Sequence, residues 1–317
     1  MFFIVNPCSA NGSTEKWWQN ALSSLDKENF DYDWSFTTGP DTAPLLTSAA
    51  LSNGYRTIVA VGGDGTVYEV LNGILKNDRL IYPDIILGIW ARGTGCDLAR
   101  SLKLPRETDD LINMLKNGKP LAIDAGRCRF FRYDGEKGSR YFLNIAEAGL
   151  GSETAARVNQ TTKVFGGFFS FLLGALISAL FFKNKFMRIT LDDTDIREGM
   201  YTLVACGNGR YFGGGMKICP EAVIDDGYFD ITAIHDIGKL DLIINLPRVY
   251  RGTHLTHPKV WHKRAKKVLI QSDKKTLVTL DGELPGVTKA EFMILPRVVR
   301  LLIPNKTFNN CDSMSNT

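Results

Sequence analysis

The sequence lacks several features that would narrow its function at once. Its six cysteines, at positions 8, 96, 128, 206, 219 and 311, include no pair at Cys-x-x-Cys spacing, which argues against a zinc site or a dithiol motif. The four histidines show no metal-binding spacing, so His254 and His257 are interpreted as loop residues. A net charge of +4 does not demand a nucleic-acid partner, and we predict none.

Targeting and repeat signals are also missing. The apolar run Met1–Val5 is too short for a secretory signal, has no basic residues before it and is stopped by Asn6-Pro7. We find no internal repeat and no low-complexity segment. Scattered free thiols suit a reducing compartment, so we expect a cytoplasmic protein.

The first third of the sequence alternates short apolar runs with stretches of helical periodicity. Strands are expected at residues 2–5, 33–36, 57–61 and 85–90, and helices around 17–25, 43–51, 67–74 and 108–117. Thr66 and Glu69 have capping-box spacing, which is typical of a helix start. Such alternation indicates a parallel sheet with helices on both faces.

The pattern changes after about Asp124. Short β-like runs follow, separated by turn residues, at 141–145, 187–191, 202–205, 229–234, 268–271, 277–280, 292–295 and 298–303. These runs favour a second, mostly antiparallel domain. We therefore predict an α/β domain over residues 1–125, a β domain over 126–304 and a polar tail over 305–317.

Two glycine-rich turns each follow a predicted strand. They read Gly62-Gly63-Asp64-Gly65-Thr66 and Gly93-Thr94-Gly95-Cys96-Asp97. Glycines allow close backbone approach to a ligand, and the N–H groups at a helix start favour phosphate. Both turns would line one crevice at the carboxyl ends of parallel strands, where Asp64 can reach a metal ion. The alternative is that each turn is only a tight strand-to-helix connection.

Further motifs narrow the interpretation. Asn6–Gly12 looks like an NPxSGxG loop, Gly93–Arg100 looks like a GTGNDxAR turn, and Leu280-Asp281-Gly282-Glu283 matches an LDGE motif. Together with the first glycine turn, Gly207–Met216 and Pro220–Asp230, these motifs resemble the diacylglycerol kinase catalytic-domain family, which includes bacterial lipid kinases and sphingosine kinases. The resemblance covers the chain from Phe2 to about Pro304.

Two positions depart from the family pattern. Cys96 stands where the family usually has asparagine, and Ala10-Asn11 stands where Gly-Lys or a similar pair is common. The change at Cys96 removes an amide donor and acceptor from the second glycine turn. It leaves the carboxylates that the chemistry needs.

The resemblance implies an α/β plus all-β fold: an NAD-kinase-like, Rossmann-like N-terminal domain and a C-terminal antiparallel β-sandwich, with the active site in the cleft between them. It implies ATP and Mg²⁺. The nucleotide would be bound by Asn6, Gly62, Gly63, Asp64, Gly65, Thr66, Gly93, Thr94 and Gly95. The metal and its waters would be held by Asp64, Asp97 and Asp124, with Asp225 and Asp226 joining them or holding a separate structural cation.

The proposed chemistry centres on the LDGE motif. Asp281 would be the general base for the attacking hydroxyl, and Glu283 would orient it or contact metal. The alternative for Asp281-Gly282 is a plain hairpin turn, because Asp-Gly is a strong turn signal. Asp225-Asp226-Gly227 has the same alternative.

The expected activity is an ATP- and Mg²⁺-dependent lipid kinase, with diacylglycerol or a related membrane lipid as acceptor. Alternatives are a soluble-substrate kinase such as an NAD kinase, or a non-catalytic lipid-binding protein of the same fold. The expected partners are the lipid substrate and the inner face of the membrane, contacted peripherally. The sequence is also compatible with a homodimer.

Two segments are candidates for membrane contact. Val164–Phe182 is uncharged and has one bulky and one small face, which suits a pocket helix or an interfacial helix better than a membrane span. A basic run at Lys259–Lys267 suits anionic head groups, with a solvated strand edge as the alternative.

Overall fold

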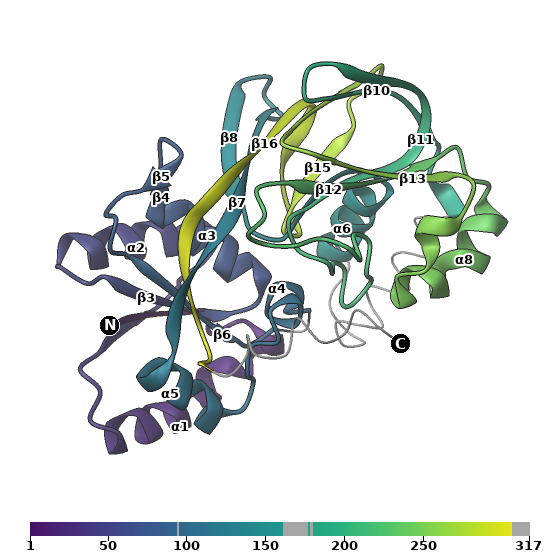
Figure 1. The fold of residues 1–317 in the computed structure, drawn as a ribbon. Coiled ribbons are helices and arrows are strands. Elements are labelled where there is room, and N and C mark those ends of the chain that lie inside the picture. Colours follow the sequence, from purple (N-terminus) through teal and green to yellow (C-terminus); the bar gives the residue numbers. More distant parts are fainter. Residues whose placement is uncertain (94, 161–176, 178–179, 306–317) are drawn as a thin grey trace. The chain divides into compact units, whose positions relative to one another are not determined.

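The computed structural model describes residues 1–93, 95–160, 177 and 180–305 (Figure 1). The chain forms two compact units. The first comprises Met1–Ile123 together with the chain from Val298, and the second comprises Asp124–Arg297. Two long strands, β7 (Lys119–Phe131) and β16 (Glu283–Ile303), carry the chain out of the first unit and back into it.

A parallel sheet forms the centre of the first unit. Its described strands run in the order β2 (Asp33–Phe36), β1 (Phe2–Val5), β3 (Thr57–Gly62), β6 (Ile86–Ala91) and the end of β16. Each neighbouring pair is parallel. β1, β3 and β6 are buried almost throughout because helices cover both faces.

The helices of the first unit divide between the two faces. Figure 1 shows α2 (Thr42–Ser52) and α3 (Asp64–Ile74) on one side of the sheet, and α1 (Thr14–Lys27) and α5 (Thr108–Asn117) on the other. The short elements are η1 (Ala10–Gly12), α4 (Asp97–Ser101) and the hairpin β4 (Leu75–Lys76)–β5 (Arg79–Leu80). An aromatic cluster of Phe3, Trp18 and Trp90 fills the core. The predicted strands and helices of this region are confirmed to within three residues.

The predicted capping box is wrong. Helix α3 begins at Asp64, with Gly63 at its N-cap, so Thr66 lies within the first turn. The Thr66 hydroxyl instead accepts a hydrogen bond from Asn6 Nδ2 at 3.1 Å. Glu69 accepts the N–H groups of Asp41 and Ala43 and thereby caps α2 rather than its own helix.

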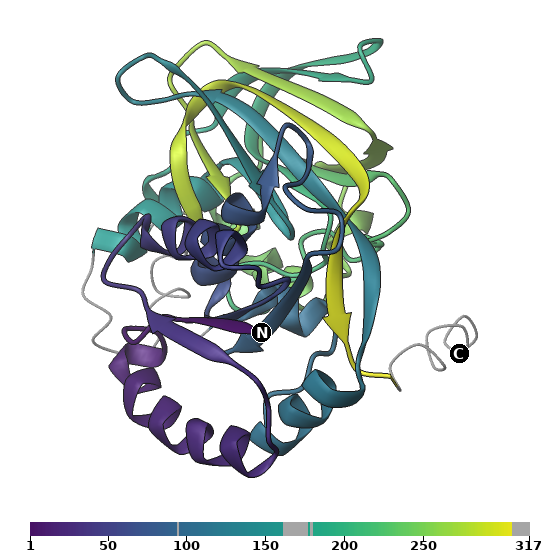
Figure 2. The ribbon, with the colours of Figure 1, turned by 90° about the vertical axis from the view of Figure 1, so that its left-hand side faces the viewer.

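The second unit is built from antiparallel strands (Figure 2). Besides parts of β7 and β16 they are β8 (Lys137–Phe142), β9 (Ile145–Gly149), β10 (Lys185–Leu191), β11 (Asp195–Gly207), β12 (Phe229–His235), β13 (Val260–Ala265), β14 (Lys267–Ser272) and β15 (Leu277–Leu280). Helices α6 (Leu150–Gln160) and α8 (Lys239–Arg251) and the short η2 (His254–Thr256) accompany them. The predicted antiparallel second domain is confirmed.

Several details of this unit differ from the sequence prediction. The expected strand at 141–145 is wrong, because β8 ends at Phe142 and β9 begins at Ile145. The two expected strands at 292–295 and 298–303 are one strand, β16, which continues through Arg297 in a left-handed conformation. Strand β7 and helices α6 and α8 were not predicted. None of the helices in the described part of the chain is long and apolar enough to cross a membrane. Most of Val164–Phe182 lies outside the described residues.

Candidate functional site

The two glycine turns of the first unit touch through their backbones. A Cβ atom on Gly93 would lie 2.6 Å from the Cα atom of Gly63, closer than a real side chain tolerates. The Arg92 N–H donates to the Gly62 carbonyl at 2.7 Å, which fixes the register of the two turns. Glycine is therefore required at position 93 by close approach, and the structure brings the predicted phosphate-binding turns together.

The loop after β1 joins the first glycine turn. Asn6 donates from Nδ2 to the Thr66 hydroxyl, and its Oδ1 accepts the Cys8 N–H at 3.0 Å. Thr66 is buried directly below Gly62, where a Cβ atom would lie 2.3 Å from Thr66 Oγ1. Of the predicted nucleotide residues, Thr94 lies outside the described residues.

Two predicted metal ligands meet beside the second glycine turn. Asp64 accepts the N–H groups of Asp97 at 3.1 Å and Leu98 at 3.3 Å, so its carboxylate links α3 to the start of α4. A Cβ atom on Gly95 would lie 3.3 Å from Asp64 Oδ2 and 3.7 Å from Asp97 Oδ2. The two carboxylates thus converge beside Gly95. Burial raises the pKa of Asp64, while the two N–H donors and nearby Arg100 lower it.

This pair of carboxylates fits a magnesium ion. Mg²⁺ prefers oxygen ligands and is usually held by one or two carboxylates, with waters and phosphate completing its shell. Asp97 is also paired with Arg100 at 2.7 Å, which offsets part of the negative charge. Asp64 and Asp97 would hold the ion in the first unit.

Cys96 occupies a strained position between Gly95 and Asp97. Its φ of 47° and ψ of 47° lie in the left-handed region, where asparagine is tolerated better than cysteine. The Cys96 thiol donates to the Gly93 carbonyl at 3.3 Å, and burial raises its pKa to about 12. The thiol therefore stays protonated and holds the turn in place.

Asp281 organises a turn in the second unit. Its Oδ1 accepts the N–H groups of Asn144 at 2.9 Å and Ile145 at 3.0 Å, and its Oδ2 accepts that of Leu143 at 2.8 Å. These three donors bend the chain between β8 and β9, which is why residues 141–145 do not form one strand. Asp281 and Gly282 both have positive φ and connect β15 to β16. The LDGE motif is thus a tight hairpin turn with a carboxylate held by backbone donors, and Glu283 beside it is exposed.

Asp124 connects three segments of the second unit. Its side chain is fully buried, and its oxygens accept the N–H groups of Gly227 at 2.6 Å and Arg297 at 2.7 Å. Burial raises the pKa of Asp124, the two N–H donors lower it, and the Asp226 and Asp225 carboxylates raise it further. Asp226 is paired with Arg264. The predicted metal residues therefore fall into two sets: Asp64 and Asp97 in the first unit, and Asp124, Asp225 and Asp226 in the second.

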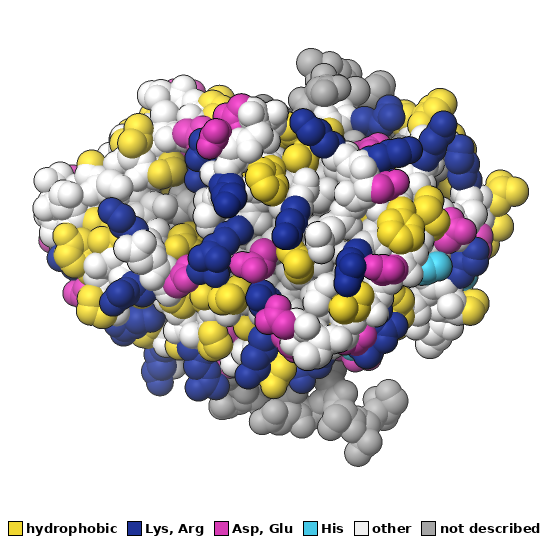
Figure 3. All heavy atoms as spheres, turned by 90° about the horizontal axis from the view of Figure 1, so that it is seen from above, with side chains coloured by type: hydrophobic (Ala, Val, Ile, Leu, Met, Phe, Trp, Pro, Cys, Tyr) yellow, Lys and Arg dark blue, Asp and Glu magenta, His cyan; other side chains and the backbone are white. Residues whose placement is uncertain are grey.

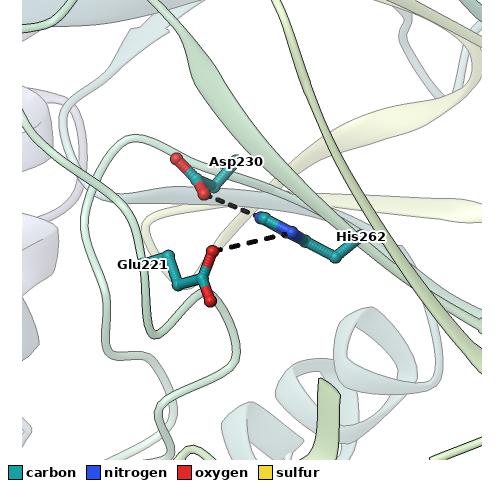
Figure 4. Close-up of side chains that lie close together, drawn as sticks. All are labelled: Glu221, Asp230 and His262. Atoms are coloured by element: carbon teal, nitrogen blue, oxygen red, sulfur yellow. Dashed lines mark hydrogen bonds and ion pairs between the residues drawn. The ribbon is translucent and has the colours of Figure 1, made fainter. Parts of the chain in front are cut away.

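Sequence reasoning missed a cluster of side chains around His262 (Figure 4). His262 contacts Asp230 at 2.8 Å through Nε2 and Glu221 at 3.8 Å through Nδ1. The hydrogen bond with buried Asp230 raises the pKa of His262. The contact depends on the pairing of β12 with β13, which places Thr232 opposite His262, so sequence spacing gave no signal.

A buried carboxyl on β9 was also missed. Glu147 accepts the Gly151 N–H at 3.1 Å and the Ser152 hydroxyl at 3.3 Å. Burial is the main cause that raises the pKa of Glu147 to about 8, so the side chain holds a proton at neutral pH. A glutamate followed four and five residues later by glycine and serine is too common a pattern to be noticed.

The basic run around β13 is largely paired. Lys263 binds Asp195, Arg264 binds Asp226, and Lys267 binds Asp193. β13 forms an edge of its sheet, as the strand-edge alternative for this run expects. On the face shown in Figure 3, basic side chains alternate with acidic ones instead of forming a field of one sign.

Two family models match the chain. Residues 1–128 match the diacylglycerol kinase catalytic domain, and residues 144–303 match the YegS C-terminal NAD kinase beta sandwich-like domain. The chain belongs to the diacylglycerol kinase-like family. Diacylglycerol kinases of Staphylococcus carnosus and Staphylococcus saprophyticus are each 28% identical to it over 306 residues, covering 96% of this chain and 95% and 96% of theirs.

Solved structures agree with this family in fold. A putative diacylglycerol kinase from Bacillus anthracis superimposes with a TM-score of 0.73 at 23% identity, covering 95% of this chain and 96% of its own. Yeast NADH kinase complexed with NADH has a TM-score of 0.53 at 11% identity, covering 95% and 81%. The family thus has an NAD-kinase-like fold with an N-terminal α/β domain and a C-terminal β-sandwich domain, as predicted. Its kinase relatives support a kinase activity.

Proposed function

We propose that this protein is an ATP- and Mg²⁺-dependent kinase that transfers the γ-phosphate to a hydroxyl of a membrane lipid, diacylglycerol or a close relative. The observation that carries the proposal is the convergence of Asp64 and Asp97 over Gly95, next to the backbone contact of Gly63 with Gly93. Oxygen ligands for a cation thus lie beside two glycine turns. The names of the Staphylococcus relatives support a diacylglycerol acceptor.

Phosphoryl transfer asks a protein mainly for positioning and for neutralisation of charge. In the proposed reaction, backbone N–H groups of the two glycine turns orient the phosphates, and the Asn6–Thr66 hydrogen bond keeps the first turn in register. Asp64 and Asp97 hold the metal ion, which when bound offsets the charge on the phosphate oxygens. Asp124 positions the Asp225–Gly227 loop, where Asp225 and Asp226 join the water network or hold a structural cation.

The acceptor hydroxyl needs a base. We assign that role to Asp281, with Glu283 orienting it or contacting the metal. The three backbone donors on Asp281 hold its carboxylate in place, as a positioned base requires. With a lipid as acceptor, the enzyme works at a membrane surface. We propose peripheral association with the inner, cytoplasmic face.

The assignment is tested by measuring transfer of labelled γ-phosphate from Mg-ATP to diacylglycerol in mixed micelles. The wild type is compared with Asp281→Asn and Glu283→Gln, each over a range of Mg²⁺ concentrations. For Asp281→Asn we expect kcat to fall by about 10²–10⁴-fold, because the base is lost, and the Mg²⁺ dependence to stay unchanged. A shifted Mg²⁺ dependence is expected for Glu283→Gln. Full activity of Asp281→Asn contradicts its assignment as base.

A further inference from the structure

Helix α8 of the second unit is apolar on two opposite faces. Its inner face packs Leu242, Leu246 and Val249 against the core that includes Met216 and Ile218. Its outer face carries large apolar side chains in contact with solvent: Leu240 is 77% exposed and Ile244 is 74% exposed. The exposed Pro247 follows three residues later on the same side. A surface helix of a soluble protein normally has a polar outer face, so this one is suited to an apolar environment.

A second apolar segment lies beside the start of α8. Leu180 is 48% exposed and Phe181 is 67% exposed, just before β10. A cavity of about 530 Å³ joins the two segments. It is lined by Phe182, Lys183, Asn184, Met200, Thr202, Asp236, Ile237, Gly238, Lys239, Leu242 and Lys259. Phe181 and Leu240 each adjoin a lining residue of this cavity in the sequence, Phe182 and Lys239, within the second unit on the side where Figure 1 shows α8.

The rim of this cavity is cationic. Lys183, Lys239 and Lys259 are all exposed and all line it. Among the described residues, Lys183 and Lys239 form neither an ion pair nor a hydrogen bond, while Lys259 donates to the Asp236 carbonyl at 2.6 Å. Their positive charge is directed at solvent beside the apolar side chains.

The acidic groups in the vicinity already have partners. Asp236 Oδ1 accepts the Asn184 amide at 2.7 Å. Asp241 on α8 accepts the Asn245 amide at 2.7 Å and contacts His257. The three exposed lysines outnumber these two carboxylates, so the charge beside the cavity favours an anionic ligand.

We propose that this docking face, formed by Leu180, Phe181, Leu240 and Ile244 with Lys183, Lys239 and Lys259, binds an anionic lipid bilayer. The four apolar side chains insert between the acyl chains, and the lysines contact phosphate groups of the lipids around the cavity. Apolar insertion combined with lysine attraction is the arrangement by which interfacial helices bind membranes. The inference deepens the proposed function because it identifies how the kinase reaches a lipid acceptor, although the docking itself needs no catalysis.

The exposed lysines of this face favour a bilayer over a second copy of this chain. A self-contact through the same face would bring Lys183 and Lys239 of two copies together, and among the described residues neither lysine has an acidic partner to offset its charge. A bilayer that contains anionic lipids presents many phosphates to the same lysines. Dimerisation through this face is an outcome that the experiment below distinguishes.

The test uses the full chain and co-sedimentation with vesicles, without ATP. Vesicles of phosphatidylcholine alone are compared with vesicles that also contain about 30 mol% phosphatidylglycerol, an anionic lipid. The first variant is the double substitution Leu240→Ser with Ile244→Ser. Its matched control is Leu45→Ser, because Leu45 on α2 is 70% exposed but belongs to the first unit. The second variant is Lys183→Gln with Lys239→Gln.

The wild type is expected to bind the anionic vesicles more tightly than the neutral ones. The Leu240/Ile244 variant loses about tenfold or more in affinity for both, because two apolar side chains no longer leave water. The lysine variant loses roughly 20-fold on anionic vesicles only, and the Leu45 variant binds as the wild type does. Equal vesicle binding by the wild type and all variants overturns the proposal. It is also overturned if the wild type is a dimer and the Leu240/Ile244 variant is a monomer that binds vesicles as the wild type does.

A parallel assay separates this inference from the proposed function. Phosphate transfer to a short-chain diacylglycerol dispersed in detergent is expected to be unchanged in the docking variants. Vesicle binding by a wild type that phosphorylates no lipid would leave the docking face standing and the kinase proposal contradicted. Lipid phosphorylation by a wild type that binds both vesicle types equally would support the kinase proposal and contradict the docking face.

Discussion

The carboxylate of Asp281 accepts the backbone N–H of Asn144 at 2.9 Å, and the neighbouring N–H groups of Leu143 and Ile145 bind the same side chain. One residue of the LDGE hairpin thereby shapes the turn between β8 and β9. Asp281 therefore has a structural role that is separable from the proposed catalytic one, and the two roles predict different measurements.

Asp281→Asn is expected to lower the free energy of unfolding by about 1–3 kcal/mol. The amide has a single oxygen, so one of the three backbone donors loses its acceptor and faces an NH₂ group. Glu283→Gln alters an exposed side chain two residues away and is expected to stay within about 0.5 kcal/mol. Urea unfolding of both variants checks the difference. Equal stability of the two variants would show that hydrogen bonds to water replace those that the backbone N–H groups make to Asp281.

Gly93→Ala is expected to destabilise the first unit by about 1–3 kcal/mol and to weaken ATP binding, because the new Cβ atom would push the two glycine turns apart. Gly39→Ala is the matched control, since no atom lies within 4 Å of its Cβ position. Thermal unfolding and calorimetric titration with Mg-ATP measure both effects. Unchanged ATP affinity in Gly93→Ala would mean that the contact between the turns does not shape the phosphate site.

Cys96 is expected to resist alkylation in the folded protein. With the pKa of its thiol at about 12, only roughly one molecule in 10⁴ carries the thiolate at pH 8, and the side chain is buried as well. Cys8 is exposed and serves as the reactive reference. Peptide mapping by mass spectrometry after iodoacetamide treatment, with and without urea, reports both sites. Comparable labelling of Cys96 and Cys8 in the native protein would contradict the buried turn.

Glu147→Gln is expected to stabilise the protein increasingly as pH rises. Burial raises the pKa of Glu147 from 4.5 to about 8, so between these values the folded state holds a proton that the unfolded state has lost. Wild-type stability therefore falls as pH rises through this window, and the loss persists above it. The glutamine keeps the contacts with Gly151 and Ser152 without a proton to lose.

Between pH 5 and 9, the wild type is expected to lose at most roughly 3–5 kcal/mol of unfolding free energy relative to Glu147→Gln. It is read as the difference in unfolding free energy between wild type and Glu147→Gln in urea titrations at several pH values. A difference that stays constant with pH would show that Glu147 ionises freely in the folded protein.

The longer strands and helices of the first unit could be predicted from the sequence because each has a strong local signal. Buried parallel strands such as Thr57–Gly62 appear as continuous apolar runs, and the glycine turns mark their ends. The contact of Gly63 with Gly93 follows from the topology of such a sheet. The capping error at Thr66 arose because a motif of two residues cannot reveal that Asn6 competes for the same hydroxyl.

The second unit was less predictable because its key contacts join distant segments. β7 contains Asp124 and Arg127, which hide its strand pattern although both are buried. The bend after Phe142 depends on Asp281, more than 130 residues later along the chain. The pairing of His262 with Asp230 depends on strand register. Helix α8 escaped notice because Pro247 lies inside it, and a proline within an apolar stretch normally indicates that a helix has ended.

The most direct test of the central claim is a comparison of acceptors. Initial rates of γ-phosphate transfer from labelled Mg-ATP are measured with diacylglycerol and with NAD, offered together in the same detergent micelles. We expect label in the lipid, little or none in NAD, and loss of transfer when Mg²⁺ is chelated. Label in NAD with none in the lipid would contradict the account and assign the protein to the soluble-substrate kinases.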